Sequence, residues 1–305
     1  FQVIDYKNIQ TMKYFRIEKN NIPNLIINYA DNYAFNITEY STYINAIEIL
    51  KIEANFRKIT RSDYINQFIA DNKIKKISLN NLLGNNKLLL PFIPDEVWAA
   101  GVTYKNSEFE RKRESSTPDI YAKVYNAKRP EIFFKSTGNR LVAPDQKIGI
   151  RSDSKWNVPE AELAVILINN EIFGYSIGND MTSREIEGEN PLYLTQAKIY
   201  DKSCSIGPCI IDSESINNYK NFIINCNIVR NNKSIYNSSS SVKSMNKSIP
   251  NLIKWLKKSN TLPVKSAFLT GTGIIPPPEF TLNENDQISI TIDGIGTLNN
   301  TVIKV

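Results

Sequence analysis

The stretch Glu160-Ala161-Glu162-Leu163-Ala164-Val165-Ile166-Leu167-Ile168 places two carboxylates directly before a run of six apolar residues. Side chains at positions i and i+2 of a β-strand point to the same side, so Glu160 and Glu162 are predicted to project together from an otherwise buried strand. A second apolar stretch ends at Asp180, 20 residues after Glu160. We therefore expect three carboxylates to meet at one place, where buried like charges require a cation.

The cation that suits these residues is a hard divalent one. Oxygen is the only ligand atom that the three carboxylates offer, which favours Mg²⁺ first and Mn²⁺ or Ca²⁺ next. The chain contains no histidine, which removes imidazole both as a metal ligand and as a base that titrates near neutral pH. Proton transfer must then fall to a carboxylate, a lysine, a tyrosine or water.

Composition sets broad limits on the class of protein. With 305 residues, 41% of them hydrophobic, the chain can bury a sizeable core in one large domain or two modest ones. The net charge of +6 is spread without a long basic block, so nucleic acid is not an expected partner. Three cysteines without Cys-x-x-Cys spacing argue against disulfides or zinc and for a reducing compartment.

The N-terminus and the apolar runs bear on localisation. No run of eighteen apolar residues occurs, and residues 1–11 lack a secretory signal pattern, so we expect a cytoplasmic protein that does not contact a membrane. Residues 1–11 precede Met12 and are expected to take no part in the fold.

Two regions follow from the patterning. Between residues 12 and 90, short strand-like and helix-like runs alternate, which predicts a small α+β N-terminal domain. The prolines of Pro91-Phe92-Ile93-Pro94 exclude a helix and mark the boundary. Residues 91–305 are predicted to form one mostly β domain, with a charged helical excursion over 108–128. Strands are expected at residues 132–134, 148–150, 163–168, 174–177, 222–229, 288–292 and 301–305.

Local signals refine this picture. The segment Arg230-Asn231-Asn232-Lys233 predicts a hairpin turn, because asparagine tolerates a positive φ. Ser248 followed by Pro250 predicts the capped start of a helix. The serines at 238–241 are interpreted as a local polar loop.

Several motifs, in this order, resemble the catalytic domain of the fumarylacetoacetate hydrolase superfamily over roughly residues 91–305. They are the Glu-x-Glu pair at 160–162, Asn179-Asp180-Met181-Thr182-Ser183-Arg184, Lys198 ahead of Gly207-Pro208, Gly271-Thr272-Gly273, and Gly294-Ile295-Gly296-Thr297-Leu298. Within the superfamily the chain is most similar to the 2-keto-3-deoxy-D-arabinonate dehydratases. The strings that carry this closer similarity are residues 129–135, 151–154 and 189–193.

The resemblance implies a mixed β-roll, an Mg²⁺ ion held by Glu160, Glu162 and Asp180, and a homodimer or homotetramer. It also implies that a small anionic 2-keto acid is the substrate, with Glu131 and Lys198 acting on it. The expected reaction removes water from a 2-keto-3-deoxy sugar acid and, after tautomerisation, gives a dioxo acid such as 2,5-dioxopentanoate. Which of Glu131 and Lys198 removes the C3 proton, and which assists departure of the C4 hydroxyl, stays open.

Three further residues are candidate substrate contacts, and each has a structural alternative. Tyr104 could instead belong to the core or to a lid. Arg184 could instead pair with Glu185 or Glu187. Thr272 could merely shape the glycine-containing turn in which it lies.

The chain also departs from the superfamily pattern. Members that hydrolyse C–C bonds use a His–Glu pair, with the histidine three residues after a tyrosine. Here Ser107 stands three residues after Tyr104, and Glu110 occupies the glutamate position. Because serine cannot serve as that base, elimination is favoured. The alternatives are hydrolysis of an acylpyruvate-like diketo acid, decarboxylation of a keto acid such as oxaloacetate, and ligand binding without catalysis.

Overall fold

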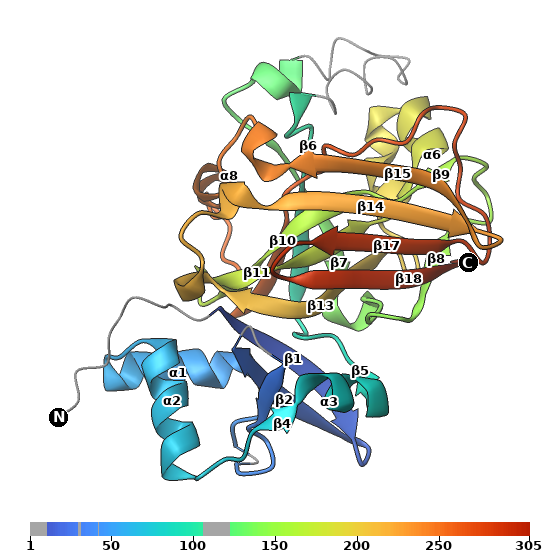
Figure 1. The fold of residues 1–305 in the computed structure, drawn as a ribbon. Coiled ribbons are helices and arrows are strands. Elements are labelled where there is room, and N and C mark those ends of the chain that lie inside the picture. Colours follow the sequence, from blue (N-terminus) through green and yellow to red (C-terminus); the bar gives the residue numbers. More distant parts are fainter. Residues whose placement is uncertain (1–10, 30–31, 42, 106–122) are drawn as a thin grey trace.

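Two β-sheets dominate the architecture of this protein (Figure 1). The structure is a computed structural model that describes residues 11–29, 32–41, 43–105 and 123–305. Ser107, Glu110 and most of the predicted helical excursion over 108–128 lie outside the described residues.

The larger sheet has eleven strands in the order β4-β3-β2-β1-β13-β11-β10-β16-β6-β7, with β5 paired to β1. Their bounds are β1 Met12–Lys19, β2 Ile22–Tyr29, β3 Tyr33–Asn36, β4 Ile77–Ser78, β5 Lys87–Leu88, β6 Glu96–Gly101, β7 Glu131–Thr137, β10 Ala161–Ile168, β11 Glu171–Asp180, β13 Cys204–Asp212 and β16 Lys265–Leu269.

The second sheet has five strands in the order β15-β14-β17-β18-β8, and β9 and β12 form a small separate pair. Their bounds are β8 Lys147–Ile150, β9 Asn157–Val158, β12 Thr182–Ser183, β14 Ile223–Arg230, β15 Lys233–Ser241, β17 Gln287–Ile292 and β18 Gly296–Lys304. The pairs β16–β6 and β18–β8 are parallel, whereas the other strand pairs are antiparallel. This mixed arrangement confirms the predicted α+β, mostly β fold of the β-roll type.

The α-helices are α1 Ile47–Arg57, α2 Arg61–Asp71, α3 Leu79–Asn85, α6 Arg184–Glu189, α7 Leu194–Lys198 and α8 Ile249–Leu256. Among the described residues, helices α1 and α2 pack on one face of the larger sheet, and Figure 1 shows them in the lower part of the molecule. Short 3₁₀ turns occur at Gly138–Arg140, Pro191–Tyr193, Ser213–Ser215, Tyr219–Asn221 and Val242–Ser244. Within the described part of the chain, no helix is both long enough and apolar enough to cross a bilayer.

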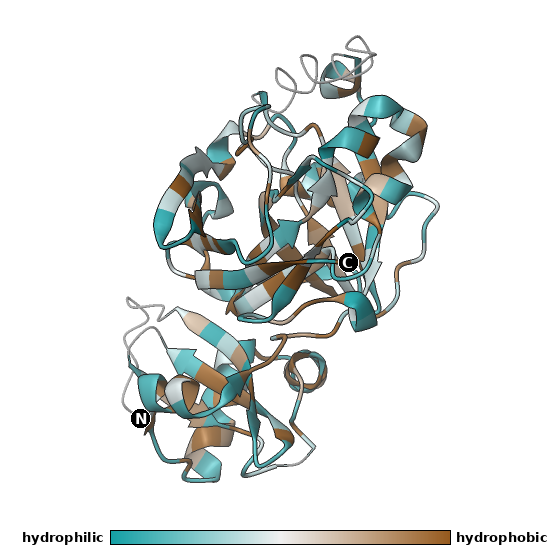
Figure 2. Ribbon diagram, turned by 90° about the vertical axis from the view of Figure 1, so that its right-hand side faces the viewer, coloured by the Kyte–Doolittle hydropathy of each residue, from teal (hydrophilic) through white to brown (hydrophobic). Residues whose placement is uncertain are grey.

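The apolar run after Glu162 forms β10, which is buried along its whole length. One face of β10 packs into the core between the two sheets, and the other face packs into a core shared with α1 and α2. A strand that is covered on both faces reads as a continuous apolar run, which is why this stretch lacks polar alternation. Strands with one exposed face, such as β14 and β17, alternate instead, and Figure 2 shows polar and apolar residues interleaved along the strands.

The N-terminal strands continue the larger sheet, because β1 pairs with β13 through Lys13–Ile211 and Tyr14–Ile210. Helices α1 to α3 and strands β1 to β5 form the lower part of the molecule in Figure 1. The sequence had predicted an α+β N-terminal region over 12–90, and both helices and strands are present there.

One local interpretation was wrong. Residues 238–241 do not form a loop but belong to β15, which pairs with β14 and forms an edge of the smaller sheet among the described strands. The pairing of an edge strand uses backbone hydrogen bonds and does not require apolar side chains, so serines can occupy it.

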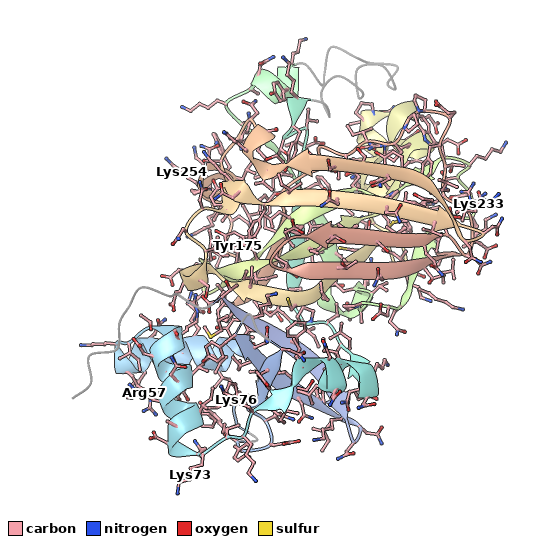
Figure 3. All side chains as sticks on the ribbon, in the orientation of Figure 1. Arg57, Lys73, Lys76, Tyr175, Lys233 and Lys254 are labelled. Carbon is pink, nitrogen blue, oxygen red and sulfur yellow. The ribbon has the colours of Figure 1, made fainter. Side chains whose placement is uncertain are left out.

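The surface cations are dispersed over many elements. Figure 3 shows Arg57 on α1, Lys73 and Lys76 after α2, Lys233 at the start of β15 and Lys254 on α8, and all five are exposed. Positive charge on separate elements, rather than on one stripe, agrees with the even spread seen in the sequence.

Candidate active site

Three carboxylates meet where β10 and β11 lie side by side. Glu160, Glu162 and Asp180 are buried, and each offers an oxygen that lies within 4.8 Å of the oxygens of the other two. The backbone of Asp180 pairs with that of Glu160 through N–H···O distances of 3.2 and 3.0 Å. The β10–β11 hairpin thus brings together residues that are 20 positions apart in the sequence.

Glu162 is fully buried beside two other acids. Its burial, followed by the charges of Asp180 and Glu160, raises the pKa of Glu162 well above its usual value. One oxygen, Oε2, accepts a hydrogen bond of 2.6 Å from the Gly271 N–H. The other, Oε1, is buried and has no hydrogen-bond partner among the described residues.

This donor set fits a hard divalent cation. A buried carboxylate oxygen without a donor carries a desolvation cost that a bound ion would offset. Carboxylate oxygens are the ligands that Mg²⁺, Mn²⁺ and Ca²⁺ prefer. The three residues that the sequence predicted as metal ligands therefore form a cluster that could hold such an ion.

Lys198 is the first of three buried cations that compensate the cluster. Its ammonium group donates to Glu160 Oε2 at 2.6 Å, to Asp180 Oδ2 at 3.1 Å and to Thr182 Oγ1 at 2.8 Å. Lys198 is the last residue of the short helix α7. Two of the three candidate metal ligands are thus in direct contact with a residue that was predicted to act on the substrate.

Lys135 is a second buried cation, and the sequence analysis did not single it out as a site residue. Its Nζ lies 2.6 Å from Asp180 Oδ1 and donates to the backbone oxygens of Met181, at 2.9 Å, and Lys198. Strand alternation alone would not have found it, because the pairing of β7 with β6 is irregular at Lys135, which is skipped between Phe134 and Ser136.

Arg184 is the third buried cation. Its NH2 group lies 2.9 Å from Glu160 Oε1, and its NH1 group lies 3.1 Å from Glu187 Oε2. Glu185, the other partner considered from the sequence, instead accepts a hydrogen bond of 2.5 Å from the backbone N–H of Lys155. Arg184 therefore bridges one acid of the cluster and one acid of its own helix, α6.

A pocket opens beside the carboxylate cluster. It is lined by residues from β6, β7, α6, α7 and the 271–272 turn, namely Ala100, Gly101, Val102, Glu131, Phe133, Glu160, Glu187, Leu194, Lys198, Gly271 and Thr272. The candidate proton-transfer residues Glu131 and Lys198 thus face the same space as Glu160. Gly101 makes room for this arrangement, because a Cβ atom at position 101 would lie 2.1 Å from Glu131 Oε2.

The turn at one wall of the pocket is built on glycine. Gly271 has a φ of +89°, and a Cβ atom there would lie 2.1 Å from Thr103 Oγ1, so both the backbone conformation and the close approach require glycine. Thr272 follows it on the pocket wall, and its Oγ1 accepts a hydrogen bond of 3.0 Å from the Ile274 N–H. Thr272 therefore shapes the turn and borders the pocket at the same time.

Tyr104 is buried close to the cluster. Its hydroxyl has no hydrogen-bond partner among the described residues, and Tyr104 is not one of the described residues that line the pocket. Burial, assisted by the charge of Glu162, raises the pKa of Tyr104. Its phenol group is thus protonated at neutral pH and can donate a hydrogen bond to an acceptor that approaches it.

Comparison with known proteins adds to this geometry. Residues 96–303 match the sequence model of the family described as fumarylacetoacetate (FAA) hydrolase C-terminal. A probable 2-keto-3-deoxyxylonate dehydratase from Haloferax volcanii is 48% identical over 216 residues, which cover 71% of this chain and 75% of the relative. A 2-dehydro-3-deoxy-D-arabinonate dehydratase from Saccharolobus solfataricus is 40% identical over 231 residues, 74% of this chain and 76% of the relative.

A solved structure agrees over nearly the whole chain. The 2-keto-3-deoxy-D-arabinonate dehydratase complexed with magnesium and 2,5-dioxopentanoate matches with a TM-score of 0.81 and 32% sequence identity, covering 96% of this chain and 99% of that one. The carboxylate cluster, Glu131 and Lys198 all fall inside the segment that matches the family. The chain therefore belongs to the fumarylacetoacetate hydrolase family.

Proposed function

We propose that this protein is a Mg²⁺-dependent hydro-lyase that removes water from a 2-keto-3-deoxy sugar acid and forms a dioxo acid such as 2,5-dioxopentanoate. The observation that carries the proposal is the pocket in which Glu131, Lys198 and Glu160 face one another beside a buried carboxylate cluster. The named activities of the two relatives, at 48% and 40% identity, support this reaction over others in the family.

Glu160, Glu162 and Asp180 would hold the ion, with Mn²⁺ or Ca²⁺ as substitutes. When bound, a divalent cation supplies Lewis-acid polarisation of the 2-keto oxygen and so makes the C3 proton easier to remove. The protein contributes a fixed, dry cradle, because Lys135, Arg184 and the Gly271 N–H each hold one of these carboxylates in place.

Glu131 and Lys198 would divide the two proton transfers of the elimination. One takes the proton from C3, and the other gives a proton to the C4 hydroxyl as it leaves as water. The C3–C4 double bond that forms then tautomerises with the C5 alcohol to give the 5-oxo group. Both line the pocket, so both can reach a substrate bound there. Thr272 and the backbone N–H groups of its turn would bind the substrate carboxylate. The Tyr104 hydroxyl, which has no hydrogen-bond partner among the described residues, would hydrogen-bond to the substrate, and Arg184 would orient Glu160.

The wider biological setting is also part of the proposal. The three cysteines are free and buried, which suits a reducing compartment, so we place the protein in the cytoplasm, where it would act in pentose catabolism. The resemblance to dehydratases of this family supports a homodimer or homotetramer.

Product analysis tests the reaction. The purified protein is incubated with 2-keto-3-deoxy pentonates and hexonates, with Mg²⁺ or with EDTA, and the products are followed by NMR. Dehydration leaves the carbon count of the acid unchanged. Hydrolysis of a C–C bond at the same site would release pyruvate and a second fragment, and decarboxylation would release carbon dioxide. Turnover that EDTA leaves unchanged contradicts the proposal, and ligand-induced thermal stabilisation without turnover identifies a binding protein instead.

A second experiment assigns the acid and the base. The compound 2-oxobutyrate has C3 protons but no hydroxyl to lose, so it reports proton removal alone. Glu131→Gln and Lys198→Ala should each abolish dehydration while still binding Mg²⁺. The variant that still exchanges the C3 protons of 2-oxobutyrate for solvent deuterium has kept the base, and the residue replaced in it is the acid. If both variants still dehydrate the substrate, the assignment of both residues is wrong.

A further inference from the structure

Glu187 is an acid of the pocket that neither the carboxylate cluster nor the proton transfers use. It comes from α6, is buried, and lines the same pocket as Glu131, Lys198 and Thr272. Arg184, three residues earlier, pairs with Glu187 and is not among the described residues that line the pocket. The helix thus presents a carboxylate, rather than a guanidinium group, to a bound ligand.

The position of Glu187 is fixed by its partner. Arg184 reaches Glu187 Oε2 with NH1 at 3.1 Å and Glu160 Oε1 with NH2 at 2.9 Å, and all three side chains are at most 7% exposed. One rigid guanidinium therefore sets the place of Glu187 relative to the carboxylate cluster. A carboxylate held in this way can discriminate between ligands, because it does not swing away from an unfavourable group.

The charge balance of the site indicates which ligands are favoured. Among the described residues, the cluster and the pocket contain five acids and three cations, which gives these groups a formal charge of −2 when all are ionised. The acids are Glu131, Glu160, Glu162, Asp180 and Glu187, and the cations are Lys135, Arg184 and Lys198. One divalent cation would bring this charge to zero. A 2-keto acid with one carboxylate then adds a single charge, whereas a dicarboxylate brings a second charge into an enclosed acidic space.

We propose that Glu187 is a specificity-determining residue that selects hydroxylated monocarboxylic 2-keto acids over dicarboxylic ones. The inference rests on the proposed function and refines its substrate class. An ionised carboxylate only accepts hydrogen bonds, so Glu187 can bind a hydroxyl group of a sugar acid and repels a second carboxylate. The same residue thereby favours a sugar acid over oxaloacetate-like compounds at this site.

The test compares binding of two ligands that have no C4 hydroxyl to lose. Calorimetry with Mg²⁺ present measures the Kd of 2-oxobutyrate, a monoanion, and of 2-oxoglutarate, a dianion, for the wild type and for Glu187→Gln. The substitution should raise the affinity for 2-oxoglutarate by about tenfold relative to the affinity for 2-oxobutyrate, as expected when one nearby charge is removed from a partly buried site. For a 2-keto-3-deoxy pentonate, kcat/KM should fall by roughly tenfold, mainly through KM, since a charged acceptor is lost.

Two further variants make the comparison specific. Glu189→Gln removes the same charge from an exposed position of the same helix and should leave the Kd ratio unchanged. Glu187→Asp keeps the charge and should retain the wild-type preference. A ratio in Glu187→Gln equal to that of the wild type overturns the proposal. If Glu187→Gln does not fold, the Kd values of the wild type alone test the proposal. Wild-type protein that binds 2-oxoglutarate as tightly as 2-oxobutyrate also overturns the proposal.

These outcomes are separable from the proposed reaction. The Kd ratios do not depend on turnover, so they test Glu187 whatever the chemistry of the site. A wild-type protein that shows the expected ratios but forms no dioxo acid from any sugar acid overturns the dehydratase proposal and supports the role of Glu187.

Discussion

At the scale of single residues, Lys198 has two roles: it compensates the charge of the carboxylate cluster, and it is a candidate for proton transfer to or from the substrate. Its ammonium group contacts Glu160 and Asp180, two of the three candidate metal ligands, and its side chain also borders the pocket. A lysine in this position offsets part of the repulsion among buried carboxylates before a metal binds. The metal and Lys198 therefore act on the same charges, and each should become more important when the other is absent.

Lys198→Met should therefore make the fold depend on metal. Removing one partner from a buried charge cluster leaves carboxylates uncompensated, and we expect the free energy of unfolding in EDTA to fall by about 3 kcal/mol. Mg²⁺ should recover more stability in this variant than in the wild type. Urea denaturation with and without Mg²⁺ measures both effects. The control is Lys202→Met at an exposed position nearby, and equal Mg²⁺ stabilisation in Lys198→Met and wild type would contradict the compensating role.

The cysteines give a residue-scale prediction about pH. Burial raises the pKa of Cys204, Cys209 and Cys226 to about 12. The thiolate is the reactive form, and a raised pKa means that it is scarce at all pH values well below 12. The native protein should therefore fail to react with a disulfide reagent at pH 8, whereas the urea-unfolded chain should react at three thiols. Rapid labelling of the native protein would show that at least one thiol is accessible.

At the scale of elements, the positions of the site residues depend on where individual strands and helices begin and end. The β10–β11 hairpin brings Asp180 opposite Glu160, and α7 ends at Lys198. The helix α8 has a side-chain cap of its own, because Ser248 accepts a hydrogen bond from the Asn251 N–H and Pro250 occupies the first turn. Such local devices set where an element begins, and their energies are measurable one at a time.

Ser248→Ala should lower the free energy of unfolding by about 1 kcal/mol, the usual cost of removing an N-cap side chain. The reason is that the first-turn N–H of Asn251 loses its acceptor. Equilibrium denaturation measures the change, and Ser248→Asp, which can still accept that hydrogen bond, should retain most of the stability. A Ser248→Asp variant as unstable as Ser248→Ala would show that the cap is not the cause.

These elements also show what a sequence can and cannot predict. The β10 strand, the turn at Asn231 and Asn232, whose φ values are 50° and 60°, and the cap at Ser248 were predicted correctly, because each is decided by residues adjacent in the chain. The neighbours of Lys135 were not predicted. They are Asp180 at the end of β11, Met181 directly after it and Lys198 in α7, and only the packing of distant segments brings them to β7.

The candidate site also combines features that the sequence predicts with features that only the tertiary structure shows. The carboxylate cluster could be predicted because Glu160 and Glu162 are two apart in a strand and Asp180 closes the next apolar stretch, and the resemblance to a known family implied the same three residues. The function of Glu187 could not, since helical spacing to Arg184 says that the two can pair but not which of them faces the pocket. That distinction depends on how α6 is rotated against the sheet, which is a property of tertiary packing.

At the scale of the whole molecule, the N-terminal region and the family-matched region share one sheet. The join lies at β1 and β13 and is reinforced by a buried polar network around Asp212. Asp212 accepts hydrogen bonds from Arg61 Nε at 2.8 Å and Arg61 NH2 at 2.5 Å, and also from the Tyr14 hydroxyl. The Arg61 guanidinium lies 4.6 Å from the centre of the Phe173 ring. The sequence had predicted a boundary near residue 91, and we propose that the two sides of it unfold together.

Hydrogen exchange can test this coupling. In increasing urea, the amides of α2 and those of β11 should lose protection in one shared transition, because continuous strand pairing and the Asp212 network link the two regions. Asp212→Ala leaves the Arg61 charge buried without this partner and should lower the free energy of the shared unfolding transition by about 3–5 kcal/mol. Asp71→Ala removes an exposed acid at the end of α2 and should shift it by less than about 0.5 kcal/mol. Loss of protection in wild-type α2 at a urea concentration where β11 is still protected would show that the N-terminal region unfolds on its own.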